Sequence, residues 1–185
     1  TSTEDKQAQD EKDSLLIVLN YAAKFYQQQL TETEEGRAIG LSYFKERGFL
    51  EYTIQSFQLG YAQDSYDSLL KDALVNGYNK DLLLKAGLIK EKNEKAYDFF
   101  RDRVMFPIHN VSGKVIAFGG RILKKSENQP KYINTAETEL YHKSQILYGI
   151  SQAKTEIRKQ DVCYLVEGYT DVISLYQAGI KNVVA

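Results

Sequence analysis

Residues 101–122 read RDRVMFPIHNVSGKVIAFGGRI and decide the fold class of this 185-residue chain. Two runs rich in β-branched and aromatic residues, RVMFPIHN and KVIAFGGRI, are joined by Asn110-Val111-Ser112-Gly113, which are residue types typical of turns. The pattern predicts an antiparallel hairpin. Pro107 is expected at a sheet edge or beside a bulge, because proline has no backbone N–H to donate.

The segment before the hairpin is expected to be mainly helical. Apolar residues at three- and four-residue spacing predict an amphipathic helix from Ser14 to Leu30. They are Leu15, Leu19, Ala22 and Phe25, with Leu16, Val18 and Tyr26 alongside. A second helix is predicted from about Thr33 to Arg47, with Gly48 ending it in the left-handed conformation.

Shorter elements are expected between these helices and the hairpin. They are a helix in residues 49–57, a strand in 58–62, a helix capped by Asp64 or Ser65 that runs to Val75, and a helix over 81–86. Residues 1–13 carry two basic and five acidic side chains and few apolar ones, which predicts a flexible acidic linker.

A βαβ unit is predicted after the hairpin. Residues 161–168, DVCYLVEG, form a continuous apolar strand, residues 169–179 a helix, and residues 180–185 the start of the next strand. Cys163 is expected to be a small core residue of this strand. The predicted fold class is therefore α+β. Because the chain stops inside the last apolar strand, we expect an incomplete domain.

Composition narrows the class of protein. The chain is 43% hydrophobic, which is enough for a core, and no apolar run approaches the roughly 20 residues of a membrane helix. The N-terminus does not resemble a secretory signal, so we expect a cytoplasmic protein. One cysteine and two histidines exclude disulfides and thiolate zinc sites, and His109 and His142 have no companion ligand motif. Neither a P-loop nor a GxGxxG motif is present.

Glu167 and Asp171 are the sharpest candidate site. Glu167 directly follows the buried strand, where open α/β sheets place their ligands, and Asp171 falls in the first turn of the next helix. Two carboxylates on one side suit Mg²⁺, which takes one or two protein carboxylates plus waters and substrate phosphates. The alternative is that Asp171 only favours the helix N-terminus and Glu167 is a solvated strand end.

The middle of the chain is locally basic, although the net charge is −1. Residues 101–143 hold eight basic and four acidic side chains. Cations with an interleaved aromatic residue can hold phosphates while a base stacks. The candidates are Arg101, Arg103, Arg121, Lys131, Tyr132, Asn134 and Lys143. An ordinary solvated surface is the alternative.

Seven stretches between Leu19 and Ala185 resemble the catalytic core of bacterial DnaG-type DNA primases, in that family's order and spacing. They are LNYAAKFYQQQL, YFKERGF, FQLGYA, FRDRVMFPIHNVSGKVIAFGGRIL, PKYINTAET, YHKSQILYGI and LVEGYTDVISLYQAGIKNVVA. The acidic EGYTDV segment alone would indicate only the wider Toprim group, which includes topoisomerases and nucleases. The basic segments together with EGYTDV make the resemblance specific.

The resemblance implies an enzyme, a nucleotidyltransferase that synthesises short RNA primers on single-stranded DNA from NTPs during replication. It implies a core subdomain over residues 14–158 and a Toprim subdomain that begins at 159–185. Glu167, as catalytic residue, and Asp171 match the acidic motif that helps hold catalytic Mg²⁺ or Mn²⁺. Matches to the template- and nucleotide-binding ridge are Arg47, Arg103, Arg121, Lys131, Tyr132, Asn134 and Lys143.

Departures from the family pattern set further expectations. The zinc-binding module upstream, the later acidic motifs and the helicase-binding domain of the family are all missing from this sequence. We therefore expect a primase fragment that is inactive alone, with the replicative helicase as a partner of the whole protein. The alternatives are a nonenzymatic single-stranded-DNA-binding module and another Toprim enzyme, a topoisomerase or a nuclease.

Overall fold

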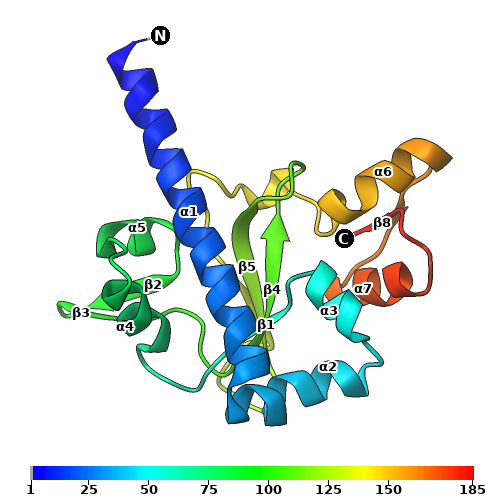
Figure 1. The fold of residues 1–185 in the computed structure, drawn as a ribbon, viewed down its shortest axis with the longest axis horizontal. Helices are drawn as coiled ribbons and strands as arrows, with labels where there is room; N and C mark the ends of the chain where they lie inside the picture. The colour runs from blue at the N-terminus through cyan, green and yellow to red at the C-terminus, as the bar shows by residue number, and fades with distance from the viewer. Residues whose placement is uncertain (1) are drawn as a thin grey trace.

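The computed structural model describes residues 2–185 and arranges them around a central antiparallel sheet (Figure 1). Its strand order is β1 (Gly60–Ala62), β4 (Arg103–His109), β5 (Val115–Ile122) and β6 (Tyr132–Asn134). The predicted hairpin is β4–β5, paired from Arg103–Ile122 to His109–Val115. Pro107 pairs with β5 but lies beyond the end of β1, beside an irregularity at Ile108 and His109, as the missing donor requires.

Helix α1 (Thr3–Glu32) packs across β1 and β5 and extends beyond the rest of the molecule at its N-terminal end (Figure 1). The apolar side chains that predicted this helix are its buried face, including Leu15, Leu19 and Tyr26. At Gly60 the two elements touch so closely that a Cβ there would lie 2.6 Å from the Tyr26 Cβ. A side chain at position 60 would therefore push α1 off the sheet.

The start of α1 differs from the flexible linker predicted for residues 1–13. Ser2 and Asp5 form a capping box, in which each side chain accepts from the other residue's backbone N–H. Residues 3–13 are helical from there on, although most of their side chains are exposed, and Thr1 lies outside the described residues. Local capping and helix propensity, which need no core, account for this extension.

Short helical segments follow α1 in the chain. They are the π-helical segment η1 (Gly36–Leu41), α2 (Ser42–Glu46) and α3 (Glu51–Ser56). Gly48 has a φ of 82°, so the predicted left-handed residue does end α2. The prediction of one helix over Thr33–Arg47 was too simple, because Thr33 is extended and η1 separates α1 from α2.

On the other side of α1 lies a small unit of α4 (Ser68–Val75), α5 (Lys80–Lys85), β2 (Ile89–Lys92) and β3 (Lys95–Asp98) (Figure 1). The β2–β3 hairpin was not predicted; its turn residues Asn93 and Glu94 both have positive φ. The predicted cap of α4 was wrong. Asp98 on β3 accepts from the backbone N–H groups of Leu69 and Leu70, at 2.8 and 3.0 Å, and serves that helix end instead.

The C-terminal part contains η2 (Lys143–Gln145), α6 (Ile150–Gln160), β7 (Tyr164–Leu165), α7 (Tyr169–Gln177) and β8 (Val183–Val184). β7 and β8 pair in parallel, which confirms the predicted βαβ arrangement. Helix α6 runs through the predicted subdomain boundary at residue 158, and that division stays a prediction. The mixture of helices and antiparallel strands confirms the α+β class.

Strand β7 is less buried than its sequence predicted. Cys163 is exposed, so its assignment to the core was wrong, and Tyr164 and Leu165 are 52% and 73% exposed. The reason is that α6 and α7 pack mainly on β8, and β8 is the one strand that pairs with β7 among residues 2–185. An apolar run signals burial only when other elements cover both faces of its strand.

The βαβ unit shares a core with the rest of the molecule. Val172, Ile173 and Val183 belong to the same buried cluster as Phe44 and Phe106. This packing places the N-terminal end of α7 beside α2, β5 and β6. Within residues 2–185, no helix is both long enough and apolar enough to cross a membrane.

Candidate nucleic-acid interface and metal site

Four side chains from three elements form what we call the basic cluster: Tyr43, Arg47, Arg121 and Tyr132. Arg121 on β5 is the register partner of Tyr132 on β6, and its guanidinium lies 4.8 Å from the Tyr43 ring centroid and 5.9 Å from that of Tyr132. Arg47 ends α2, 5.6 Å from the same Tyr43 centroid, and its Nε donates to the Tyr43 hydroxyl at 3.1 Å. Tyr43 thus holds two cations together through its ring and its hydroxyl.

The positive charge of this region is not neutralised by the protein. Across residues 2–185, none of Arg47, Arg121, Lys131 and Lys143 forms a salt bridge. The Nε of Arg121 is buried and has no hydrogen-bond partner among the described residues. An arginine with no acidic partner keeps its full positive charge, and an anion that accepts from the accessible part of its guanidinium would be bound favourably.

Tyr169, the first residue of α7, connects this cluster to the βαβ unit. Its hydroxyl accepts from the Asn134 amide at 2.8 Å, and its ring centroid lies 6.3 Å from Tyr132 and 4.3 Å from Tyr148. The ring lies directly on Gly119, where a Cβ would be 2.5 Å from a ring carbon. The glycine at position 119 is therefore what allows α7 to approach the sheet.

The carboxylates begin at the same helix end. Thr170 accepts from the Arg47 guanidinium at 3.4 Å, and Asp171 follows it in the first turn of α7. A Cβ at Gly168 would lie 3.0 Å from the Asp171 Oδ2, so this carboxylate is turned back toward the strand end that carries Glu167. Both carboxylates are exposed, and neither is ion-paired within the described part of the chain.

These two carboxylates fit part of a Mg²⁺ site. Both offer hard oxygen ligands with no competing cation, and Mg²⁺ retains waters and takes substrate phosphates as its other ligands. In residues 2–185, no three His, Cys, Asp or Glu side chains are grouped so as to hold a metal ion. The pair can thus contribute to a shared site but does not form a closed one.

The remaining predicted cations lie in different surroundings. Arg103 is only 4% exposed and donates to the carbonyls of Gly120, Pro130 and Lys131 at 3.1–3.2 Å, so it fixes the segment just before β6 that carries Lys131. Burial lowers the pKa of Arg103. Lys131 is exposed and, with Arg121, Lys124 and Lys125, lines a hollow of about 510 Å³ beside the basic cluster.

Lys143 lies further along the chain, on η2. Its side chain is exposed, and its backbone N–H donates to Glu137 at 2.8 Å. Within the described residues, no contact brings it into the basic cluster. Its neighbour Tyr141 is buried, and burial raises the pKa of the Tyr141 hydroxyl while the Asn134 side chain opposes the rise.

Burial and charge act in opposite directions on the tyrosines of the site. Burial raises the pKa of Tyr132 most, the neighbouring Tyr43 adds to the rise, and the charges of Arg121 and Arg47 oppose it. Burial raises the pKa of Tyr169 to about 12, with the Asn134 hydrogen bond opposing it. Both hydroxyls therefore remain protonated at neutral pH and act as hydrogen-bonding groups rather than as bases.

The sequence prediction missed the residues that hold this site together: Tyr43, Tyr169 and Thr170. One local signal for Tyr43 was its place four residues before Arg47, since this spacing puts two side chains on one helix face. For Tyr169 the signal was its position directly after Glu167-Gly168, in the first turn of the helix. The abundance of tyrosine, 14 in the chain, concealed both.

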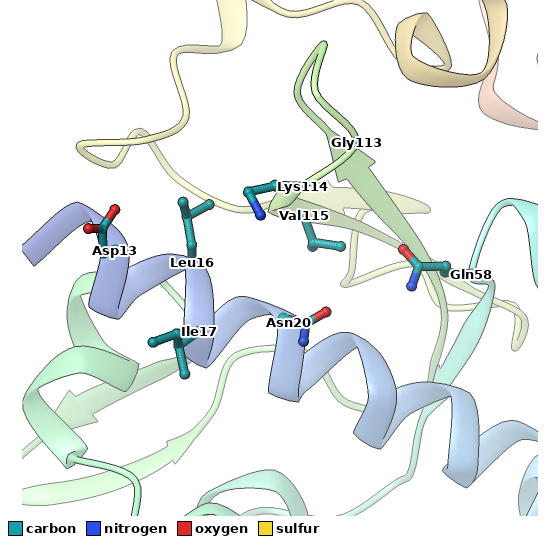
Figure 2. Close-up of a pocket in the computed structure, with 8 residues that line it drawn as sticks. All are labelled: Asp13, Leu16, Ile17, Asn20, Gln58, Gly113, Lys114 and Val115. Atoms are coloured by element: carbon teal, nitrogen blue, oxygen red, sulfur yellow. The ribbon is translucent and has the colours of Figure 1, made fainter.

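A separate hollow lies at the turn end of the hairpin, between α1 and the β4–β5 turn (Figure 2). It has a volume of about 420 Å³ and is lined by Asp13, Leu16, Ile17, Asn20, Gln58, Gly113, Lys114 and Val115. The lining holds one acid and one base and no member of the basic cluster. It therefore lies outside the candidate interface.

Comparison with known proteins gives a consistent result. A family model described as "DNA primase catalytic core, N-terminal domain" matches residues 25–154. The DNA primase of Halalkalibacterium halodurans is 41% identical over 182 residues, which are 97% of this chain and 30% of that protein. The chain thus spans less than a third of the length of this curated relative.

Solved structures show the same relationship. A DNA primase domain from Pseudomonas aeruginosa is 44% identical, with a TM-score of 0.84, over 92% of this chain and 53% of that one. The RNA polymerase domain of Mycobacterium tuberculosis primase DnaG, solved in complex with a double-stranded DNA oligomer with a 6-nucleotide overhang, is 37% identical with a TM-score of 0.88, over 94% and 54%. The fold, the order of the motifs and the extent of these matches agree: the chain belongs to the family of bacterial DnaG-type DNA primase catalytic cores.

Proposed function

We propose that this chain provides the template-binding surface and part of the metal site of a primase that synthesises RNA primers on single-stranded DNA. The observation that carries the proposal is the Arg47–Thr170 contact at 3.4 Å. It places an unpaired cation of the basic cluster against the helix turn that holds Asp171. The template backbone, bound by the basic cluster, would then lie next to the nucleotide phosphates that are bound through metal at Asp171.

The basic cluster would bind template through its free cations. Arg47, Arg121 and Lys131 would contact phosphates, with Lys143 extending the same surface, and such contacts position a strand without reading its sequence. Tyr132 is 38% exposed and would stack a base. Asn134 and Arg103 would act indirectly, because Asn134 already donates to Tyr169 and the buried Arg103 already donates to three backbone carbonyls.

Glu167 and Asp171 would help hold Mg²⁺ or Mn²⁺, with Glu167 as the catalytic residue. When bound, the metal ion neutralises charge on the phosphates of an incoming nucleoside triphosphate. The exposure of both carboxylates and their freedom from ion pairs in residues 2–185 support this role. We also propose that the whole protein supplies further acidic metal ligands and a zinc-binding module. It would act in the cytoplasm with a replicative helicase as its partner.

The test is Glu167→Gln in a chain of the length of the curated relatives. The substitution keeps the size of the side chain but removes the charge that Mg²⁺ requires, so primer synthesis should be lost while template affinity is retained. Glu156→Gln is the matched control, since Glu156 is partly exposed on α6 and contacts only Gln160 by a side-chain hydrogen bond among the described residues. The 185-residue chain alone should make no primers.

Two results would contradict the proposal. If the Glu167→Gln variant still synthesises primers, Glu167 is not a ligand of the catalytic metal ion. Template-dependent dinucleotide synthesis by the 185-residue chain would show that the carboxylate pair needs no further ligands. If the longer chain binds single-stranded DNA but never synthesises primers, the nonenzymatic binding module becomes the correct description.

A further inference from the structure

Gln177, the last residue of α7, bonds to the chain segment that follows Arg47. Its Oε1 accepts from the Leu50 backbone N–H at 2.8 Å, and its Nε2 donates to the Gly48 carbonyl at 2.7 Å. The partners are one donor and one acceptor, so the side chain must offer both an acceptor and a donor, as the amide does in this orientation. Because both partners are backbone atoms, the side chain at position 177 is what decides whether the contact exists.

Helix α7 is therefore attached to the same segment at both of its ends. Thr170 accepts from Arg47 at the N-terminal end, and Gln177 bonds to Gly48 and Leu50 at the C-terminal end. Two attachment points on one helix fix its direction as well as its distance from α2. The carboxylates of Glu167 and Asp171 lie at the N-terminal end of the helix that is oriented in this way.

Apolar packing also holds α7, but it acts differently. Val172 and Ile173 are fully buried, and the Tyr176 ring packs edge-on against Phe57 with centroids 5.1 Å apart. Burial of apolar area opposes separation of the helix but is itself non-directional. Hydrogen bonds lose strength steeply with misalignment, so the Gln177 pair adds an angle-dependent constraint on the orientation of α7.

We propose that Gln177 is a positioning residue, which fixes the Glu167/Asp171 carboxylate pair relative to the basic cluster by holding α7 to residues 48–50. The inference rests on the proposed function for its consequence in catalysis. The geometric claim stands apart from it and is tested first. Gln177 touches neither template nor nucleotide in this scheme, and it acts through the orientation of α7.

The geometric test uses Cys163, the single cysteine of the chain, which is exposed just before β7. Spin labels on Cys163 and on Lys45→Cys, at an exposed position of α2, report the distance between the βαβ unit and the segment that carries Arg47. Double electron–electron resonance on the 185-residue protein should give one narrow distribution. Gln177→Met keeps the side-chain length but removes both hydrogen bonds, and the single narrow distribution should be lost.

Two further variants separate positioning from general loosening. Gln55→Met is the matched control, because the Gln55 amide makes only a 3.5 Å contact with Glu51 inside α3, and its distribution should stay narrow. Gln177→Glu should be broad at neutral pH, since a carboxylate cannot donate to the Gly48 carbonyl. Below a pH of about 4 the protonated carboxyl again has one donor and one acceptor, and the narrow distribution should return. A distribution in Gln177→Met as narrow as that of the unsubstituted protein overturns the proposal.

The catalytic consequence is measured in a chain of the length of the curated relatives. Gln177→Met should lower kcat for primer synthesis on the order of tenfold or more, as small misplacements of reacting groups do, with template Kd unchanged. Unchanged kcat beside a broadened distribution overturns the positioning role and leaves the proposed function intact. Full synthesis in Glu167→Gln is the separate result that overturns the proposed function.

Discussion

The Asn134 side-chain amide donates a 2.8 Å hydrogen bond to the Tyr169 hydroxyl and so joins strand β6 to the helix that carries Asp171. Both residues meet at Gly119, since a Cβ there would lie 3.0 Å from the Asn134 Oδ1 and 2.5 Å from the Tyr169 ring. The candidate template surface and the candidate metal ligands are thus related through one glycine in the central sheet.

Gly119→Ala should destabilise the protein, because its methyl group would overlap the Tyr169 ring. Overpacking of this kind costs about 1–3 kcal/mol, measured by urea denaturation. The double variant Gly119→Ala/Tyr169→Leu removes the ring, so the two substitutions should cost less together than the sum of their separate effects. Additive costs would show that the methyl group is accommodated without touching Tyr169.

Arg121→Ala/Lys131→Ala should weaken single-stranded-DNA binding and reduce its dependence on salt. Each phosphate contact to a single strand contributes roughly 0.7 to the slope of log affinity against log salt, so two lost contacts should flatten it by about 1.4. The control is Lys80→Ala/Lys85→Ala, because these lysines already pair with Glu91, Glu11 and Asp81. Weaker binding with an unchanged slope would instead indicate damaged folding or lost stacking.

Tyr132→Ala distinguishes a stacking residue from a core residue. If the partly exposed ring stacks a base, its removal should cost on the order of 1–3 kcal/mol of DNA affinity with little effect on the salt slope. The ring also lies 6.4 Å from Phe106, centroid to centroid. A drop in Tm without a drop in affinity would therefore assign Tyr132 to the core.

His109 should make the protein less stable in acid. Burial lowers the pKa of His109 from 6.5 to about 4, and its Nε2 lies 2.6 Å from the Gln58 Oε1. The unfolded state thus binds the proton more readily than the folded state. The contribution of neutral His109 to the free energy of unfolding is therefore fully present above pH 6.5 and falls as the pH drops toward 4. It amounts to about 3 kcal/mol over that range.

The measurement is the free energy of unfolding against pH for the unsubstituted protein and for His109→Gln. Burial raises the pKa of Asp98 to about 6, which acts in the opposite sense, since the folded state then favours the protonated carboxyl. Asp98 is common to both proteins, so their difference isolates His109. His142→Gln is the control, because His142 is exposed. Parallel curves for His109→Gln and the unsubstituted protein would contradict the prediction.

Local patterns in the sequence were enough to predict the main elements of this fold. The spacing of Leu15, Leu19 and Ala22 gave the buried face of α1, and the turn residues at 110–113 gave the β4–β5 hairpin. These signals are local because helix and strand periods follow from backbone geometry. The β2–β3 hairpin was missed because its turn, Asn93-Glu94, lacks the glycine that usually marks such a turn.

The candidate residues were also largely named from sequence, but their roles were not. Arg103 and Arg121 are 18 residues apart on one hairpin and look alike in the chain. In the structure Arg103 donates to three backbone carbonyls, whereas Arg121 has a buried Nε without a hydrogen-bond partner among the described residues. Such a difference depends on which side of a strand faces the core and on what packs there.

Long-range contacts are what the sequence alone did not determine. Arg47 meets Thr170 and Gln177 meets Gly48 across more than 120 residues of chain. The exposure of Cys163 follows in the same way from which elements cover β7. Periodicity and turn chemistry, which act between near neighbours, fix the elements and the residue types available for binding. Tertiary packing decides which of those residues come together, because buried volume and directional hydrogen bonds are satisfied only in the assembled molecule.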